Sequence, residues 1–179
     1  ITASPAAGWK FKEWQFSKTD ENYDAWYADG YSSTDATIHI NAQHNGTLIA
    51  VFEPRYSLVG SLQDDSGNGG MPGWEDYTKT FTVNSSSPVD LTRTCTLQAN
   101  KTYKLQVHDL ATSTNLGRSG CDPVCVLEEN ASLVMENSNN DVFLYTSGAG
   151  EYIFKITAVD GSGHPTLTVL RPYQVLSYL

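Results

Sequence analysis

The residues of this sequence with a clear chemical use are aromatic side chains set among amides and carboxylates. Trp74 follows a Met-Pro-Gly turn, which directs the chain outward, and precedes Asp76 and Tyr77. A rigid indole or phenol ring offers apolar area at little entropic cost and packs against the C–H face of a pyranose. Gln63 and Asn68 are the expected partners of the sugar hydroxyl groups. We therefore predict a carbohydrate-binding loop around Trp74; the alternative is that Trp74 only caps the end of the fold.

A second aromatic cluster lies in an insert at residues 15–34. Tyr23, Trp26, Tyr27 and Tyr31 stand there among acidic and amide side chains. Four aromatic rings in so short a polar segment cannot all enter a small core, so some are expected on the surface. We predict that Tyr23, Trp26 and Tyr27 contribute to sugar binding. The alternative is that these rings attach the insert to the neighbouring domain.

The sequence offers little for catalysis or metal binding. It contains no Gly-x-Ser-x-Gly elbow for a serine nucleophile. The adjacent Asp64 and Asp65 lie in a loop pattern, where such acids are more often solvated than bound to Ca²⁺. The four histidines are scattered without the spacing of zinc ligands. We predict no catalytic residue, no metal and no cofactor, and an enzyme of unknown type stays as an alternative.

The acidic balance of the chain argues against two classes of partner. Its 179 residues include 20 Asp and Glu against 11 Lys and Arg, a formal net charge of −9. Nucleic acids and anionic membranes both require a cationic face, so neither is an expected partner. The sequence has no apolar run of about 18 residues, the length that a transmembrane helix needs. A neutral glycan meets no electrostatic penalty on such a surface.

The three cysteines cannot all pair with one another. Cys121 and Cys125 flank a short Asp-Pro segment, and a disulfide between them would close a small loop. Cys95 is in phase with Leu91 and Leu97 on an alternating run, which favours a buried free thiol.

Alternation of apolar and polar residues indicates an all-β fold. Runs with period two, bounded by Gly, Asn, Asp or Pro, occur at residues 55–62, 80–83, 97–107, 142–145, 150–156 and 165–169. Such runs are typical of half-buried antiparallel strands. No segment keeps a helical period, and short strands at regular spacing predict a β-sandwich. Among the rings on these runs, four are expected mostly in the core: Tyr103, Phe143, Tyr152 and Phe154.

Five segments in this order resemble the immunoglobulin-like β-sandwich modules found beside the catalytic domains of bacterial pullulanases and amylases and in surface starch-binding proteins. They are Y-x-L-V-G-S from residue 56, Trp74, the L-x-A run from residue 97, N-x-G at residues 115–117, and G-x-Y-x-F followed by P-T-L-T-V at residues 150–169. Asn100 stands where these modules usually carry Gly. The resemblance spans residues 55–172 and implies that the Trp74 loop contacts α-glucan. Asn115 is expected to hold a turn.

The first part of the chain resembles the small β repeats of bacterial surface proteins. Its pattern is G-aromatic-x-F-x-x-W from residue 8, I-x-I at residues 38–40, and N-G-T-L-x-A-V-F-E-P ending at residue 54. We expect a three-stranded appendage at residues 1–54, followed by the β-sandwich module at residues 55–179. Three strands are marginal alone, so the appendage should pack on the sandwich. Trp14 is expected to be structural.

These patterns together predict a non-catalytic carbohydrate-binding module of a larger bacterial chain, secreted or on the cell surface, and monomeric. Its partners would be starch, amylose, amylopectin or maltooligosaccharides, in the context of polysaccharide degradation. Two further alternatives stay open. One is a structural or adhesive surface domain, and the other is a module for a different glycan, such as xylan or chitin.

Overall fold

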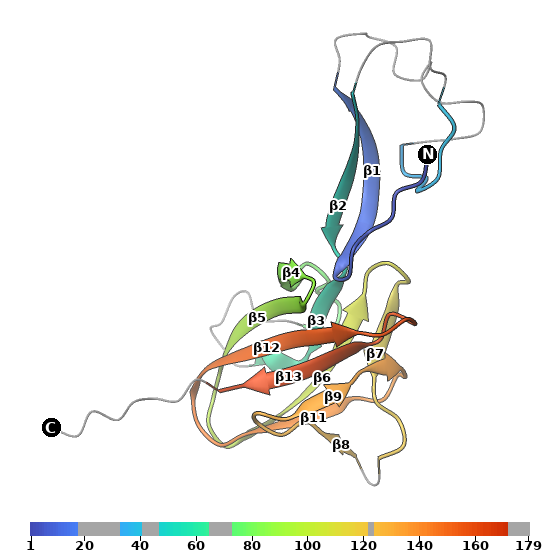
Figure 1. The fold of residues 1–179 in the computed structure, drawn as a ribbon. Coiled ribbons are helices and arrows are strands. Elements are labelled where there is room, and N and C mark those ends of the chain that lie inside the picture. The colour runs from blue at the N-terminus through green and yellow to red at the C-terminus, as the bar shows by residue number, and fades with distance from the viewer. Residues whose placement is uncertain (18–32, 41–46, 65–72, 122–123, 172–179) are drawn as a thin grey trace, which may run out of the picture.

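The structure, a computed structural model, describes residues 1–17, 33–40, 47–64, 73–121 and 124–171. Within these ranges the chain is built from β-strands and one short 3₁₀ turn, η2 (Ser61–Asp64) (Figure 1). The strands are β1 (Trp9–Ser17), β2 (Thr47–Pro54), β3 (Tyr56–Gly60), β4 (Thr82–Ser86), β5 (Val89–Leu97), β6 (Lys101–Asp109), β7 (Thr114–Gly117), β8 (Cys125–Val126), β9 (Ser132–Val134), β10 (Glu136–Asn137), β11 (Val142–Thr146), β12 (Gly150–Val159) and β13 (Pro165–Leu170).

Strands β3 to β13 form two facing sheets. One sheet has the order β4-β5-β12-β13-β9. The other has the order β10-β7-β6-β11-β8, with β3 also paired to β6. The pairs are antiparallel except for β8 with β11, which run parallel. This arrangement confirms the predicted all-β sandwich.

The core between the sheets follows the predicted alternation. Tyr103, Leu105 and Val107 of β6 point inward, and Tyr152 and Phe154 of β12 meet them from the other sheet, all of them buried. Together with the remaining inward side chains they form one continuous apolar cluster. The predicted core positions of Tyr103, Tyr152 and Phe154 are therefore confirmed.

Phe143 departs from this prediction. Its neighbours Val142 and Leu144 are buried in the core, whereas Phe143 is half-buried on the outer face of β11. Both faces of β11 carry large apolar residues, so the sequence alone does not show which face points inward.

Cys95 is buried in the core as a free thiol, as predicted. Burial raises the pKa of this thiol to about 11. Cys121 and Cys125 form a disulfide, a pairing that the sequence allowed without deciding it.

Strands β1 and β2 form a hairpin with its own small core of Ala3, Trp14 and Ile38. Trp14 is buried, and its Nε1 donates a hydrogen bond to a backbone carbonyl 2.9 Å away, which confirms its structural role. A β-bulge after Phe11 shifts the register, so that Phe11 packs on Trp14 with ring centroids 5.3 Å apart. Residues 36–40, expected as the second of three strands, are not a strand in the structure and meet the N-terminal segment through an isolated bridge between Thr2 and Thr37.

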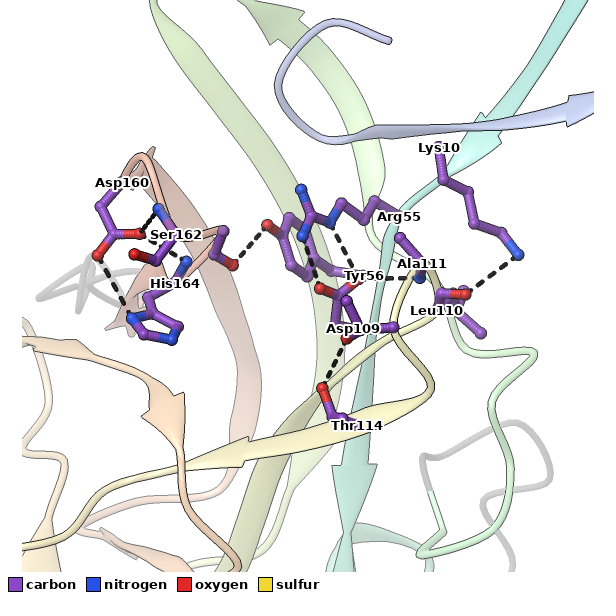
Figure 2. Close-up of polar contacts among 12 residues, drawn as sticks. Lys10, Arg55, Tyr56, Asp109, Leu110, Ala111, Thr114, Asp160, Ser162 and His164 are labelled. Atoms are coloured by element: carbon purple, nitrogen blue, oxygen red, sulfur yellow. Dashed lines mark hydrogen bonds and ion pairs between the residues drawn. The ribbon is translucent and has the colours of Figure 1, made fainter. Parts of the chain in front are cut away.

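Arg55 joins the hairpin to the sandwich (Figure 2). Its Nε and Nη2 donate to the two carboxylate oxygens of Asp109 at 2.9 and 2.7 Å. Its backbone amide donates to the carbonyl of Gly8, and its own carbonyl accepts from the amide of Leu110, both at 2.8 Å. Arg55 therefore bonds to the hairpin and to the end of β6 at the same time.

The adjoining residues reinforce this junction. Tyr56 is fully buried and donates its hydroxyl to the carbonyl of Gly163, 2.9 Å away in the turn between β12 and β13 (Figure 2). Burial would raise the pKa of Asp109, but hydrogen bonds from Arg55 and from the amide of Ala111 outweigh it and lower that pKa below its usual value. The hairpin is thus held at one end of the sandwich, as Figure 1 shows.

Candidate functional site

The predicted Trp74 loop lies on the surface, but its two rings differ in exposure. Trp74 is half-buried, whereas 38% of Tyr77 is exposed. The Tyr77 ring stacks on the buried ring of His108, with centroids 3.9 Å apart. His108 Nδ1 in turn shares a hydrogen bond of 2.7 Å with Asn115 Oδ1. Tyr77 is therefore a fixed and partly open ring.

Asp76 shapes the same loop instead of pointing freely toward solvent. Its Oδ1 accepts hydrogen bonds from the backbone amide and the hydroxyl of Thr78, and its Oδ2 lies 3.5 Å from Lys79 Nζ. The hydrogen bond from the Thr78 hydroxyl is the main cause of the lowered pKa of Asp76. Asp76 thus supports the turn that presents Tyr77.

Asn115 has a different role from the one predicted. It lies within strand β7 and orients His108 rather than holding a turn. In the sequence, a His and an Asn seven residues apart gave no sign that they would meet; only the pairing of β6 with β7 places them opposite each other.

The structure does not describe the side chains of the other predicted sugar contacts. Tyr23, Trp26, Tyr27 and Asn68 lie outside the described residues. Gln63 belongs to η2, but its side chain lies outside what the structure describes. Their roles stay predictions.

A cavity of about 330 Å³ opens beside β11 and β8. Its size falls at the lower end of ligand-binding pockets, about 300–1,000 Å³. Half of the side chains that line it are polar, and one is an aromatic ring: Arg118, Cys121, Val124, Cys125, Asn139, Asn140, Asp141 and Phe143.

Backbone contacts fix the turn that carries the amides of this cavity. The amide of Arg118 donates to the carbonyl of Asn140, and the amide of Asn140 donates to the hydroxyl of Ser138. Gly117 lies so close to this turn that a Cβ there would stand 1.9 Å from the Asn140 carbonyl oxygen. The Cys121–Cys125 disulfide ties the opposite rim into a short loop. The shape of the cavity is therefore fixed by backbone contacts at the strand ends and by the disulfide.

The charges around the cavity are balanced. Arg118 pairs with Glu136 at 3.3 Å, and Lys104 lies 3.9 Å from the carboxylate of Asp141. Hydrogen bonds from the hydroxyl and amide of Ser119 lower the pKa of Glu136, which keeps this carboxylate ionised beside Arg118. Such an arrangement disfavours a strongly charged ligand and suits a neutral one.

The amides of Asn139 and Asn140 remain available for a ligand. Within the described ranges neither side chain has an intramolecular hydrogen-bond partner, although both line the cavity. Phe143 adds a ring beside them, with the Lys104 ammonium 5.5 Å from its centroid. Amides, a carboxylate, a guanidinium and a flat ring are the groups that bind the hydroxyls and C–H faces of a sugar.

Sequence reasoning missed this cavity. The polar run Asn-Ser-Asn-Asn-Asp from residue 137 is typical of a turn and by itself does not indicate a binding site. A stretch so rich in amides next to an alternating run with an aromatic residue was the available signal. Its proximity to Arg118 could not be read from the sequence, because it depends on the pairing of β10 with β7.

The described part of the chain holds neither a metal centre nor a membrane-spanning helix. No group of His, Cys, Asp and Glu side chains there is arranged to hold a metal ion. Nor does any helix in those ranges have the length and apolar character to cross a membrane.

No protein-family model matches the sequence, and no curated protein matches it either. Among solved structures, one titled "Ligand induced structure of AmyP-SBD" is similar, with a TM-score of 0.44 and 12% sequence identity. The alignment covers 66% of this chain and 72% of the other. A similarity of this size does not establish a shared function.

Proposed function

We propose that the chain is a non-catalytic carbohydrate-binding module whose main site is the cavity between Arg118 and Phe143. The observation that carries the proposal is the pair of available amides, Asn139 and Asn140, beside the ring of Phe143. A pyranose bound there would place a C–H face near the ring and its hydroxyls on the amides and on Asp141. A site so open to water and with few hydrogen bonds predicts weak affinity.

The proposed glycan is an α-1,4-glucan such as amylose, amylopectin or a maltooligosaccharide. This choice rests on the sequence resemblance of residues 55–172 to modules of starch-degrading enzymes. The near-neutral lining of the cavity is compatible with uncharged glucose units. We further propose that the module acts as a monomer within a larger secreted or cell-surface bacterial protein, and that the β1–β2 hairpin serves as a spacer.

The Trp74 loop is proposed as an additional contact. Two side chains on the outer face of β6 lie next to these rings. His108 stacks on Tyr77, and Lys104, four residues earlier in the strand, lies beside Phe143. That spacing corresponds to about 13 Å along a strand. A glycan that crosses this face could therefore meet both rings.

Calorimetric titration with maltoheptaose tests the main site. We expect the double substitution Asn139→Ala and Asn140→Ala to weaken binding about tenfold, because each lost hydrogen bond contributes roughly 1 kcal/mol or less in an open site. Tyr77→Leu, which removes a flat ring outside the cavity, should weaken binding less.

Asn137→Ala is the matched control, because Asn137 belongs to the same segment but does not line the cavity. It should bind like the wild type. Unchanged affinity in the Asn139/Asn140 variant would remove the cavity from the proposal. Wild-type protein that binds no maltooligosaccharide but binds xylan or chitin fragments would replace α-glucan with another glycan.

A further inference from the structure

We infer that Tyr145 is a second stacking position, so that the site takes an internal stretch of a linear glycan and not a single sugar unit. This inference rests on the proposed function and extends its site. Tyr145 follows Phe143 by two residues on β11, and both project from the outer face while Val142, Leu144 and Thr146 are buried. Two residues of a strand advance about 7 Å, a distance comparable to a step along a sugar chain.

The Tyr145 ring is both open and fixed. Its exposed fraction is 53%, the largest of any ring in the described sandwich, and its hydroxyl donates to Asn100 Oδ1 over 3.1 Å. A ring that is already held in place loses little conformational entropy when a ligand stacks on it. An exposed aromatic side chain with its hydroxyl anchored is suited to a flat ligand face.

Asn100 explains how the ring is anchored. Its φ is 57°, in the left-handed region that Gly and Asn adopt most readily. Its backbone N–H donates a hydrogen bond to the carbonyl of Thr146, 2.7 Å away. The modules that this sequence resembles usually carry Gly at this position. Asn keeps the turn and adds the acceptor for Tyr145, so we assign Asn100 as a positioning residue.

The surroundings of Tyr145 favour the same neutral chain that the cavity would take. Lys104 lies on the neighbouring strand β6, on the same face, and bridges from the Phe143 ring to Asp141. Thr102, which pairs directly with Tyr145, is also exposed on this face. Both groups lie on β6, so a chain that runs along β11 from the cavity to Tyr145 would find polar contacts on that side.

Titrations with glucose and maltoheptaose test the inference, because a single glucose unit can occupy the cavity without reaching Tyr145. Wild-type protein should bind maltoheptaose more tightly than glucose. Tyr145→Ala should weaken maltoheptaose binding about tenfold, the loss expected for one stacking contact, and leave glucose binding within about twofold. Tyr145→Phe keeps the ring but loses its hydrogen bond to Asn100, so it should weaken maltoheptaose binding several-fold, less than Tyr145→Ala does.

Two further variants separate stacking from general damage. Asn100→Gly keeps the turn and removes the acceptor, so it should weaken maltoheptaose binding several-fold while Tyr145 remains present. Val134→Ala changes an exposed apolar residue of the other sheet and should have no effect.

The outcomes distinguish this inference from the proposed function. Equal effects of Tyr145→Ala on both sugars, or no effect on either, would overturn the second stacking position and leave the cavity standing. If wild-type protein binds neither sugar, the α-glucan function fails and the extended site fails with it.

Discussion

At the residue scale, the chemistry of the proposed site depends on single side chains whose neighbours fix them. Tyr77 rests on His108, Tyr145 is tied to Asn100, and the turn with Asn139 is pressed against Gly117. None of these contacts joins residues adjacent in sequence. The sequence identified aromatic residues with the right chemistry, yet it favoured Trp74, which is half-buried, over Tyr145, which is more open.

Gly117→Ala is expected to weaken sugar binding without touching a ligand. The new Cβ would lie 1.9 Å from the Asn140 carbonyl oxygen and 2.8 Å from that of Ser138, so the turn must move. We expect about tenfold weaker maltoheptaose binding, because the amides leave their positions, and a stability loss of about 1–3 kcal/mol. Titration and urea unfolding measure the two effects.

Gly161→Ala is the matched control, because a Cβ there meets no atom within 4 Å. It should leave both affinity and stability close to the wild type. A Gly117→Ala protein that binds as tightly as the wild type would show that the position of this turn does not govern binding.

At the element scale, strand patterns were predictable and strand neighbours were not. Long alternating runs such as β6 and β12 were recognised because one face is apolar and the other polar. Strands of two residues, such as β8 and β10, carry too little pattern to be assigned. Yet Cys125 of β8 lines the cavity, and the pairing of β10 with β7 places the following amides near Arg118. The bulge in β1 likewise reversed a parity that simple alternation cannot anticipate.

The junction between hairpin and sandwich is expected to depend on pH through Asp109. Its folded-state pKa is lowered, so its contribution to stability is present above the usual carboxyl pKa of 3.8 and is lost as the pH falls through the lower folded value. Asp109→Asn should cost about 3 kcal/mol at neutral pH, since it leaves Arg55 partly buried without a counter-charge.

Urea unfolding of both proteins at several pH values checks this expectation. The difference between wild type and Asp109→Asn should be constant above about pH 5 and should shrink below about pH 4. Asp90→Asn, which removes an acid from a more exposed ion pair with Lys155, is the control and should cost under about 1 kcal/mol. A difference that does not change with pH would contradict the role assigned to the Asp109 carboxylate.

At the scale of the whole molecule, the hairpin and the proposed site lie at different ends. Figure 1 shows β1 and β2 at one end of the sandwich, with β8 and β11 near the other. Arg55 and Asp109 hold the hairpin at its end, while the cavity and Tyr145 lie on the outer face of the sheet that contains β11. This arrangement suits the proposed spacer role, because the hairpin leaves the sugar-binding face uncovered.

The labelling rate of the buried Cys95 thiol reports how often the sandwich opens. Cys95 can react with a thiol reagent only when the sandwich opens, since it is buried and its raised pKa leaves little thiolate at neutral pH. A glycan that binds only the closed form should slow the labelling of Cys95. The labelling rate should fall with the fraction of protein that has no glycan bound. Mass spectrometry of the labelled protein would measure the labelling rate of Cys95 with and without glycan. Fast labelling of the native protein would contradict this expectation. The core cysteine thereby reports on a ligand that never approaches it.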